Sequence, residues 1–136
     1  MNKLFLGEMG PAIKEQWMED SDVLVVDDDQ LILDLTSSFF QSEGMEVHCV
    51  LNGEEALRML RERTFTLMVT DLNMPGMDGI ELAVKAREIA PRMPIFMSTG
   101  DISPEVVRLA AEAGIAKVFS KPFHLTKVLA LIRKTR

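Results

Sequence analysis

Short apolar runs alternate along the chain with longer segments of helical periodicity. The runs are rich in Val, Ile, Leu, Met and Phe, and they predict strands at 23–26, 45–51, 65–69, 94–97 and 117–119. In the segment after each run, apolar residues recur at the spacing of one helix face. Because parallel strands need crossover connections, the alternation predicts an α/β domain with a doubly wound, five-stranded parallel sheet and helices on both faces.

Capping signals support the predicted helix boundaries. Asn52 and Asp78 each stand three residues before an acid, as in a capping box. Ser103 precedes a proline, which is favoured at the first position of a helix. Gly44 and Gly114 stand where C-terminal caps are expected.

The helical spacing also predicts which apolar side chains face the core. These are, helix by helix, Leu31, Ile32, Leu35, Phe39 and Phe40; Ala56, Leu57 and Leu60; Ile80, Ala83, Val84, Ala86 and Ile89; Val106, Val107, Leu109 and Ala110; and Leu125, Val128, Leu129 and Ile132. Residues 1–22 fall outside the alternation and contain the only tryptophan, Trp17. We expect 1–22 to be an N-terminal extension or linker and 23–136 to be the domain. Three roles are open for residues 1–22: packing on the domain, contact with a partner, or a linker remnant.

Composition narrows the class of protein. The 136 residues are 47% hydrophobic and 26% charged, which is typical of one globular domain. Cys49 is the only cysteine, so the chain has no internal disulfide, and no apolar run has the length of a signal peptide core or a membrane span. We expect a cytoplasmic protein without a membrane partner. A net charge of −6 also argues against direct DNA binding.

Polar residues that follow the predicted strands suggest where the chemistry lies. Asp27 and Asp28 follow the first strand, Asp71 the third, Thr99 the fourth and Lys121 the fifth. Ligands of open α/β sheets bind beyond the carboxyl ends of the strands, so these side chains are expected to converge. Clustered carboxylates without His or Cys suit Mg²⁺, and a carboxylate beside Mg²⁺ and an ammonium is placed to attack a phosphoryl group. The expected product is an aspartyl phosphate.

These residues resemble the receiver domain of bacterial two-component response regulators. The matching motifs are VLVVDDD at 23–29, MVTDLNMPGMDG at 68–79, STG at 98–100 and KPF at 121–123, and the resemblance spans about 22–135. It implies the flavodoxin-like receiver fold. It also implies that Asp71 is the phosphoacceptor and that Thr99 and Lys121 contact the phosphoryl group.

The resemblance implies a Mg²⁺ site as well. Asp28 and Asp71 match metal-ligating carboxylates, Asp27 matches a neighbour that reaches the metal largely through water, and Asn73 would lend its backbone carbonyl. Asn73 and Asp101 match positions that flank the attacking water and tune the lifetime of the phosphoryl group.

Some residues call for a structural role instead. Asp29 is expected to cap the first helix. His48 and His124 are expected to have surface or capping roles. Receivers often carry an aromatic residue three positions before the lysine; here that position is Val118, and Phe119 is expected to be a core residue of the last strand.

The function implied is that of a stand-alone receiver, because the chain ends about where the fifth helix should end. It would accept a phosphoryl group from a sensor histidine kinase or a histidine phosphotransfer protein and signal to an unknown downstream protein by contact. The alternative is a receiver excised from a hybrid histidine kinase or a larger regulator.

We do not expect an enzyme beyond Mg²⁺-dependent self-phosphorylation and self-dephosphorylation, since a phosphatase of the haloacid dehalogenase group would have Asp in place of Asn73. A phosphate-independent binding domain would not need the whole charged set.

Overall fold

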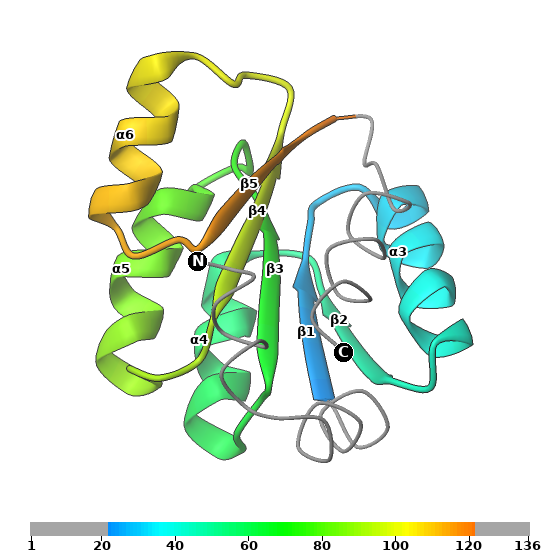
Figure 1. Ribbon diagram of the computed structural model, residues 1–136. Coiled ribbons are helices and arrows are strands. Elements are labelled where there is room, and N and C mark those ends of the chain that lie inside the picture. Colours follow the sequence, from blue (N-terminus) through cyan, green and yellow to red (C-terminus); the bar gives the residue numbers. More distant parts are fainter. Residues whose placement is uncertain (1–21, 122–136) are drawn as a thin grey trace, which may run out of the picture.

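The computed structural model describes residues 22–121, which form one parallel sheet and four helices (Figure 1). In chain order the elements are β1 (Asp22–Val26), α3 (Gln30–Ser42), β2 (Glu46–Val50), α4 (Gly53–Glu62), β3 (Leu67–Asp71), α5 (Gly79–Ile89), β4 (Ile95–Thr99), α6 (Pro104–Glu112) and β5 (Lys117–Ser120). The predicted α/β class is confirmed. The expected fifth helix, with Leu125, Val128, Leu129 and Ile132, lies outside the described residues.

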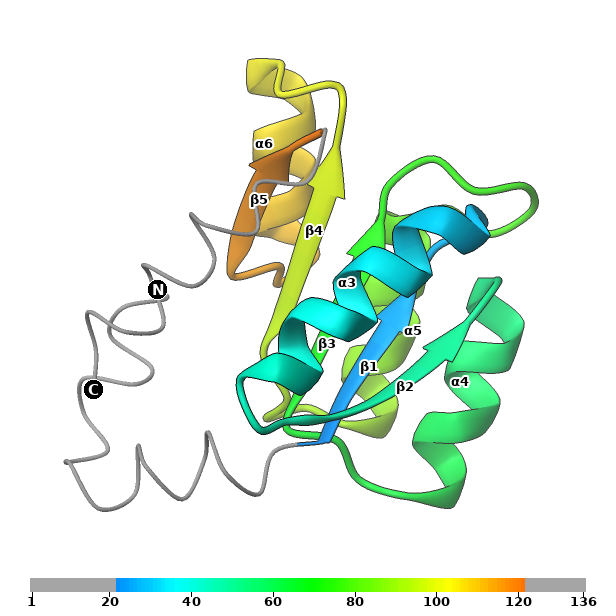
Figure 2. The ribbon, with the colours of Figure 1, turned by 90° about the vertical axis from the view of Figure 1, so that its right-hand side faces the viewer.

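The sheet has the strand order β2-β1-β3-β4-β5, and every neighbouring pair is parallel. The central strands β1, β3 and β4 are buried almost throughout, as strands covered on both faces should be. In Figure 2, α3 lies on one side of the sheet and α4, α5 and α6 on the other. None of the helices within residues 22–121 is long and apolar enough to cross a membrane.

Alternate residues of the strands supply two cores. Leu24, Met68 and Met97 point to the α4, α5 and α6 side, where they pack with residues such as Leu60 and Leu82. On the opposite side the core contains residues of β1, β3 and β4 together with residues from and just after α3: Val23, Val25, Leu33, Phe40, Met45, Leu67, Val69 and Phe96. The period of two along each strand thus divides the buried apolar side chains between the faces.

The predicted helix caps are present. The Asn52 side-chain oxygen accepts the Glu55 N–H, as an N-cap does, and the Asn52 side-chain amide donates to the Glu55 carboxylate. The side chains of Asp78 and Ser103 accept backbone N–H groups at the start of α5 and α6. Gly44 and Gly114 both have φ of 87°, the left-handed conformation that ends a helix at low cost for glycine.

The predicted inner face was wrong for part of three helices. On α3, Leu31 and Leu35 are 64% and 53% exposed, whereas Leu33 and Thr36 are buried. Apolar residues occur around much of this helix, so their spacing does not define a single stripe, and the faces that meet the sheet are set by packing. Val84 on α5 and Val107 on α6 are also exposed rather than buried.

Candidate functional site

The carboxyl ends of four neighbouring strands bring the predicted site residues to one edge of the sheet. Asp71 and Thr99 are the last residues of β3 and β4, Asp27 directly follows β1, and Lys121 directly follows β5. The register pairs Asp71 with Ser98, so the ends of β3 and β4 stand almost level. A crossover order with β1 beside β3 therefore places carboxylates from distant parts of the chain side by side.

Three carboxylates form the centre of the site. Oxygen atoms of Asp27, Asp28 and Asp71 all lie within 4.8 Å of one another. Asp27 and Asp71 are buried, at 2% and 4% exposure, whereas Asp28 is exposed. The cluster thus opens to solvent on the Asp28 side and is closed on the sheet side.

Lys121 balances part of this charge. Its Nζ lies 3.1 Å from Asp71 Oδ1 and 3.4 Å from Asp27 Oδ2, so one ammonium bridges the two buried carboxylates. One positive charge against three carboxylates leaves a net negative centre. A bound cation would relieve the remaining repulsion.

Burial dominates the ionisation of the site. Desolvation raises the pKa of Asp27 and of Asp71. The hydrogen bond from the Asp29 N–H to Asp27, and the contacts of Lys121 with both carboxylates, offset this only in part. For Lys121, burial acts to lower the pKa, but the hydrogen bond to Asp71 and the charges of both carboxylates outweigh it, so the pKa is raised. The carboxylates therefore favour a proton or a cation, while the lysine stays charged.

The donor set fits a hard divalent cation. The three ligand atoms are carboxylate oxygens, no His or Cys within residues 22–121 joins them, and one of the three residues is open to solvent. Mg²⁺ prefers oxygen ligands and keeps several waters, so a half-open cluster with few protein ligands suits it better than an enclosed cage would. Asp27, Asp28 and Asp71 are the residues that would hold it.

Local hydrogen bonds fix the loop after β1. Asp27 Oδ1 accepts the Asp29 N–H at 2.9 Å. The Asp29 side chain in turn accepts the N–H groups of Leu31 and Ile32. Asp29 is therefore the N-cap of α3, as predicted, and its carboxylate is oriented to the helix and not to the cluster.

On the β4 side, the hydroxyl of Thr99 is fully buried and ordered. Thr99 Oγ1 accepts the Asp101 N–H at 3.0 Å, and Asp101 Oδ1 accepts the Ser103 N–H at 3.0 Å. The bond from the Ser103 N–H places the Asp101 carboxylate at the start of α6. Asn73, in the loop after β3, has an exposed side chain.

Two residues that support Asp71 could not be identified from the periodicity of the strands and helices. The Thr70 hydroxyl is fully buried and donates to the Asp71 carbonyl at 2.9 Å. Gly79, the first residue of α5, packs against the Asp71 backbone so closely that a Cβ would meet the carbonyl oxygen and lie 3.1 Å from Leu72 Cα. The glycine at the end of the MPGMDG motif was the only sequence clue to this contact.

Neighbouring residues of β5, Val118 and Phe119, face opposite sides of the sheet. Val118 packs against the core on the α4, α5 and α6 side, and Phe119 packs against the opposite core, where its ring meets that of Phe96 edge to face. Phe119, predicted to be a core residue, is half-buried and packs against the edge of that core. His48, expected at the surface or at a cap, is half-buried on β2 with its ring edge to face against Phe65 and Nε2 3.5 Å from Glu46 Oε1. His124 is outside the described residues.

Comparison with known proteins agrees with this geometry. The family model of the response regulator receiver domain matches residues 23–133. The response regulator receiver protein CpdR of Brucella abortus is 37% identical over 82% of this chain and 93% of its own length. The transcriptional regulatory protein SrrA of Staphylococcus aureus is 34% identical over 85% of this chain, which spans about half (49%) of that protein.

Solved structures show the same fold. A CheY-like receiver domain from Methanospirillum hungatei has a TM-score of 0.78 at 33% identity, covering 84% of this chain and 91% of its own. Chemotaxis protein CheY4 of Vibrio cholerae has a TM-score of 0.79 at 30% identity, covering 85% and 98%. The strand order, the acidic edge and these similarities lead to one conclusion: the chain belongs to the response regulator receiver domain family of two-component systems.

Proposed function

We propose that Asp71 accepts a phosphoryl group from the phosphohistidine of a sensor histidine kinase or a histidine phosphotransfer protein. The observation that carries this proposal is the convergence of Asp27, Asp28 and Asp71 with Lys121 at the carboxyl edge of the sheet. Receiver domains as a family are signalling phosphoacceptors that bind Mg²⁺ at an acidic pocket and interact with such kinases.

The proposed transfer is a displacement at phosphorus. A carboxylate oxygen of Asp71 attacks, a P–O bond forms, the P–N bond to the imidazole breaks, and the leaving imidazole takes a proton from solvent. Lys121, 3.1 Å from Asp71 Oδ1, balances the negative charge of the transferred group. Thr99 uses its hydroxyl oxygen to accept the Asp101 N–H, which leaves the hydroxyl proton for a phosphoryl oxygen.

Mg²⁺ held by the three carboxylates would supply charge neutralisation for the phosphoryl oxygens. The protein side chains position the reacting groups, because Asp27 and Asp71 are buried. The bond from the Asp29 N–H to Asp27 holds the end of β1, and the bond from the Thr70 hydroxyl to the Asp71 carbonyl holds the end of β3. Asn73 and Asp101 are proposed to influence the lifetime of the acyl phosphate, since they lie two residues beyond Asp71 and Thr99.

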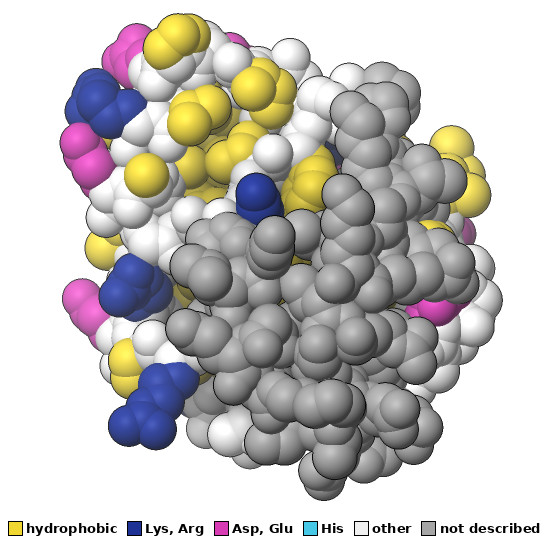
Figure 3. Space-filling model, in the orientation of Figure 1, with side chains coloured by type: hydrophobic (Ala, Val, Ile, Leu, Met, Phe, Trp, Pro, Cys, Tyr) yellow, Lys and Arg dark blue, Asp and Glu magenta, His cyan; other side chains and the backbone are white. Residues whose placement is uncertain are grey.

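The signal is proposed to leave by protein contact near α6 and β5. Ile102 and Val107 are each 43% exposed, and apolar side chains gather on this side of the space-filling view (Figure 3). Thr99, the last residue of β4, accepts the Asp101 N–H, and the Asp101 carboxylate accepts the N–H of Ser103, the N-cap of α6. A rearrangement at Thr99 would therefore reach the start of α6 through two hydrogen bonds.

The test is the mass of the intact protein after incubation with acetyl phosphate. The native chain is expected to gain one phosphoryl group only when Mg²⁺ is present. Asp71→Asn removes the acceptor, and Asp34→Asn, an exposed position on α3, is the matched control that keeps it. The proposal predicts an adduct in the native chain and in Asp34→Asn but none in Asp71→Asn; an adduct in all three would contradict it.

A further inference from the structure

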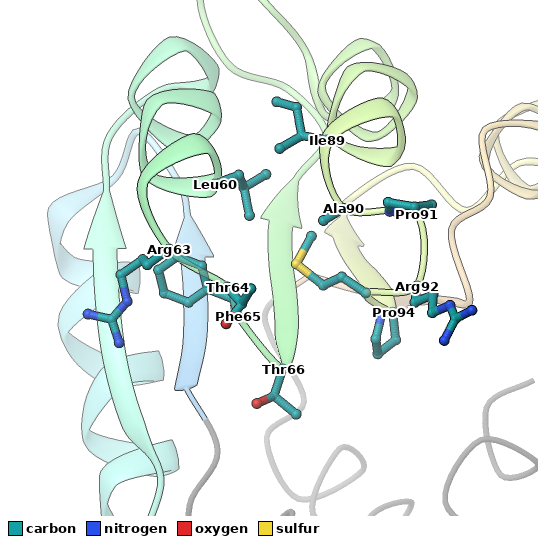
Figure 4. Close-up of a pocket in the computed structure, with 11 residues that line it drawn as sticks. Leu60, Arg63, Thr64, Phe65, Thr66, Ile89, Ala90, Pro91, Arg92 and Pro94 are labelled. Carbon is teal, nitrogen blue, oxygen red and sulfur yellow. The ribbon is translucent and has the colours of Figure 1, made fainter.

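An apolar cleft lies at the end of the sheet opposite Asp71. It has a volume of about 480 Å³ and is open to solvent (Figure 4). Its lining comes from the end of α4 and the loop to β3, and from the end of α5 and the loop to β4: Leu60, Arg63, Thr64, Phe65, Thr66, Ile89, Ala90, Pro91, Arg92, Met93 and Pro94. None of these residues takes part in the phosphoacceptor site.

The cleft has an apolar floor and a basic rim. Leu60, Phe65 and Met93 are buried members of the core, whereas Arg63 and Arg92 are exposed. In Figure 4 the two guanidinium groups extend outward from the ends of the lining. A small polar ligand is normally oriented by several converging polar groups, and the floor offers none. The cleft suits a bulky apolar side chain whose neighbours are acidic.

The chain enters the described domain at the edge of this cleft. Asp22, the first described residue, holds two lining residues through three bonds. Its carbonyl accepts the Thr66 N–H at 2.8 Å and its own N–H donates to Thr66 Oγ1 at 3.3 Å. Its carboxylate pairs with Arg63 at 2.7 Å. Residues that precede Asp22 therefore start beside the cleft, whatever path they follow.

The preceding segment has the matching chemistry. Residues 15–21 read EQWMEDS and contain three acids, no base and the only tryptophan of the chain. Trp17 is five residues from Asp22, and an extended segment of that length reaches about 17 Å, enough to bring the indole over the cleft. A buried tryptophan removes about 150–250 Å² of surface from water, more than any other side chain of this segment.

We propose that residues 15–20 of the same chain dock on this cleft, with Trp17 against the apolar floor and the flanking acids facing Arg92. The N-terminal extension is then a clamp on the end of the domain remote from Asp71. Contact with Leu60 and Phe65 joins the extension to α4 and to the start of β3. This arrangement is independent of phosphoryl transfer.

Trp17 fluorescence tests the proposal directly, because Trp17 is the only tryptophan. In the full chain its emission is expected at shorter wavelength than in the urea-unfolded chain, and independent of protein concentration. Arg92→Glu reverses a rim charge and is expected to shift the emission toward that of the unfolded chain. Arg58→Glu makes the same change of charge on the exposed side of α4, outside the cleft, and is expected to leave the emission unchanged.

Methyl NMR with labelled methionine locates the contact. Trp17→Ala is expected to move the methyl signal of Met93, which lines the cleft, and to leave that of Met68, buried within β3, in place. Emission equal to that of the unfolded chain would overturn the proposal. So would shielding of Trp17 without any shift of Met93, which means docking elsewhere, or shielding that appears only as a dimer forms, which means that a second copy is the occupant.

Discussion

Gly79→Ala should disturb the phosphoacceptor without touching its side chain. Gly79 and Gly53 are both the first residue of a helix, directly after the N-cap. A Cβ at Gly79 would meet the backbone of Asp71 and Leu72, which cannot move without shifting the end of β3. A Cβ at Gly53 would meet the Met77 side chain, at 2.7 Å from Sδ and 3.2 Å from Cβ and Cγ; Sδ can rotate away, and the two carbons need a shift of a few tenths of an ångström. The same added methyl group thus meets a rigid obstacle in one place and a soft one in the other.

Overpacking against backbone costs about 1–3 kcal/mol of unfolding free energy. With a urea slope of about 1–3 kcal/mol per M for a small domain, a loss of about 2 kcal/mol lowers the unfolding midpoint by about 1 M. Gly53→Ala should change stability by less than about 1 kcal/mol, because methionine adapts to small changes of volume. Gly79→Ala should also slow the gain of a phosphoryl group from acetyl phosphate, followed by intact mass, whereas Gly53→Ala should not. Equal urea midpoints and equal rates in the two variants would refute the reasoning.

Four further predictions concern charged groups in and beside the site. Asp29→Ala removes the N-cap of α3 and should lower the free energy of unfolding in urea by about 1 kcal/mol, without changing the Mg²⁺ affinity measured by titration calorimetry. Asp28→Ala should weaken Mg²⁺ binding in the same assay. Weaker binding in Asp29→Ala but not in Asp28→Ala would make Asp29 the ligand. Lys121→Met should slow the gain of a phosphoryl group from acetyl phosphate about tenfold or more, because a charge-assisted hydrogen bond contributes about 1.5–3 kcal/mol. An unchanged rate would show that Lys121 takes no part in the transfer. Burial raises the pKa of Asp27 and Asp71, so protons compete with the cation at higher pH than they do for ordinary carboxylates. Mg²⁺ affinity, measured by titration calorimetry, should therefore fall as the pH is lowered toward the raised pKa values. In the metal-free protein the folded state keeps these protons to higher pH than the unfolded state does. The free energy of unfolding should therefore fall as the pH rises from 3.8 through the raised pKa values. A rise over this range would contradict the assignment.

Local chemistry made most of the fold predictable. Caps such as Asn52 and Asp78 act within one helical turn, so their effect can be read from neighbouring residues. The buried strands stand out because both faces of a parallel sheet are covered, and the apolar run in β1 has no polar interruption. The convergence of Asp27 and Asp71 followed from the rule that ligands bind beyond the carboxyl ends of parallel strands.

Tertiary packing decided what the sequence pattern did not. Leu31 and Leu33 are both apolar, yet only Leu33 faces the sheet, because the orientation of α3 depends on contacts with β1 and β2 rather than on its own composition. Thr70 lies within a hydrophobic strand, and nothing in its neighbours shows that its hydroxyl bonds to the Asp71 carbonyl. The approach of Gly79 to Asp71 likewise depends on how α5 meets the end of β3.

The identity of the phosphorylated residue is the most direct test of the proposed function. Treating the phosphorylated protein with borohydride reduces an aspartyl phosphate to homoserine, which peptide mass spectrometry can locate. The geometry at the end of β3, with Asp71 buried and held by Lys121, predicts homoserine at position 71 alone. Homoserine at Asp27 or Asp28, or none in protein that has gained a phosphoryl group, would contradict the assignment of Asp71 as the phosphoacceptor.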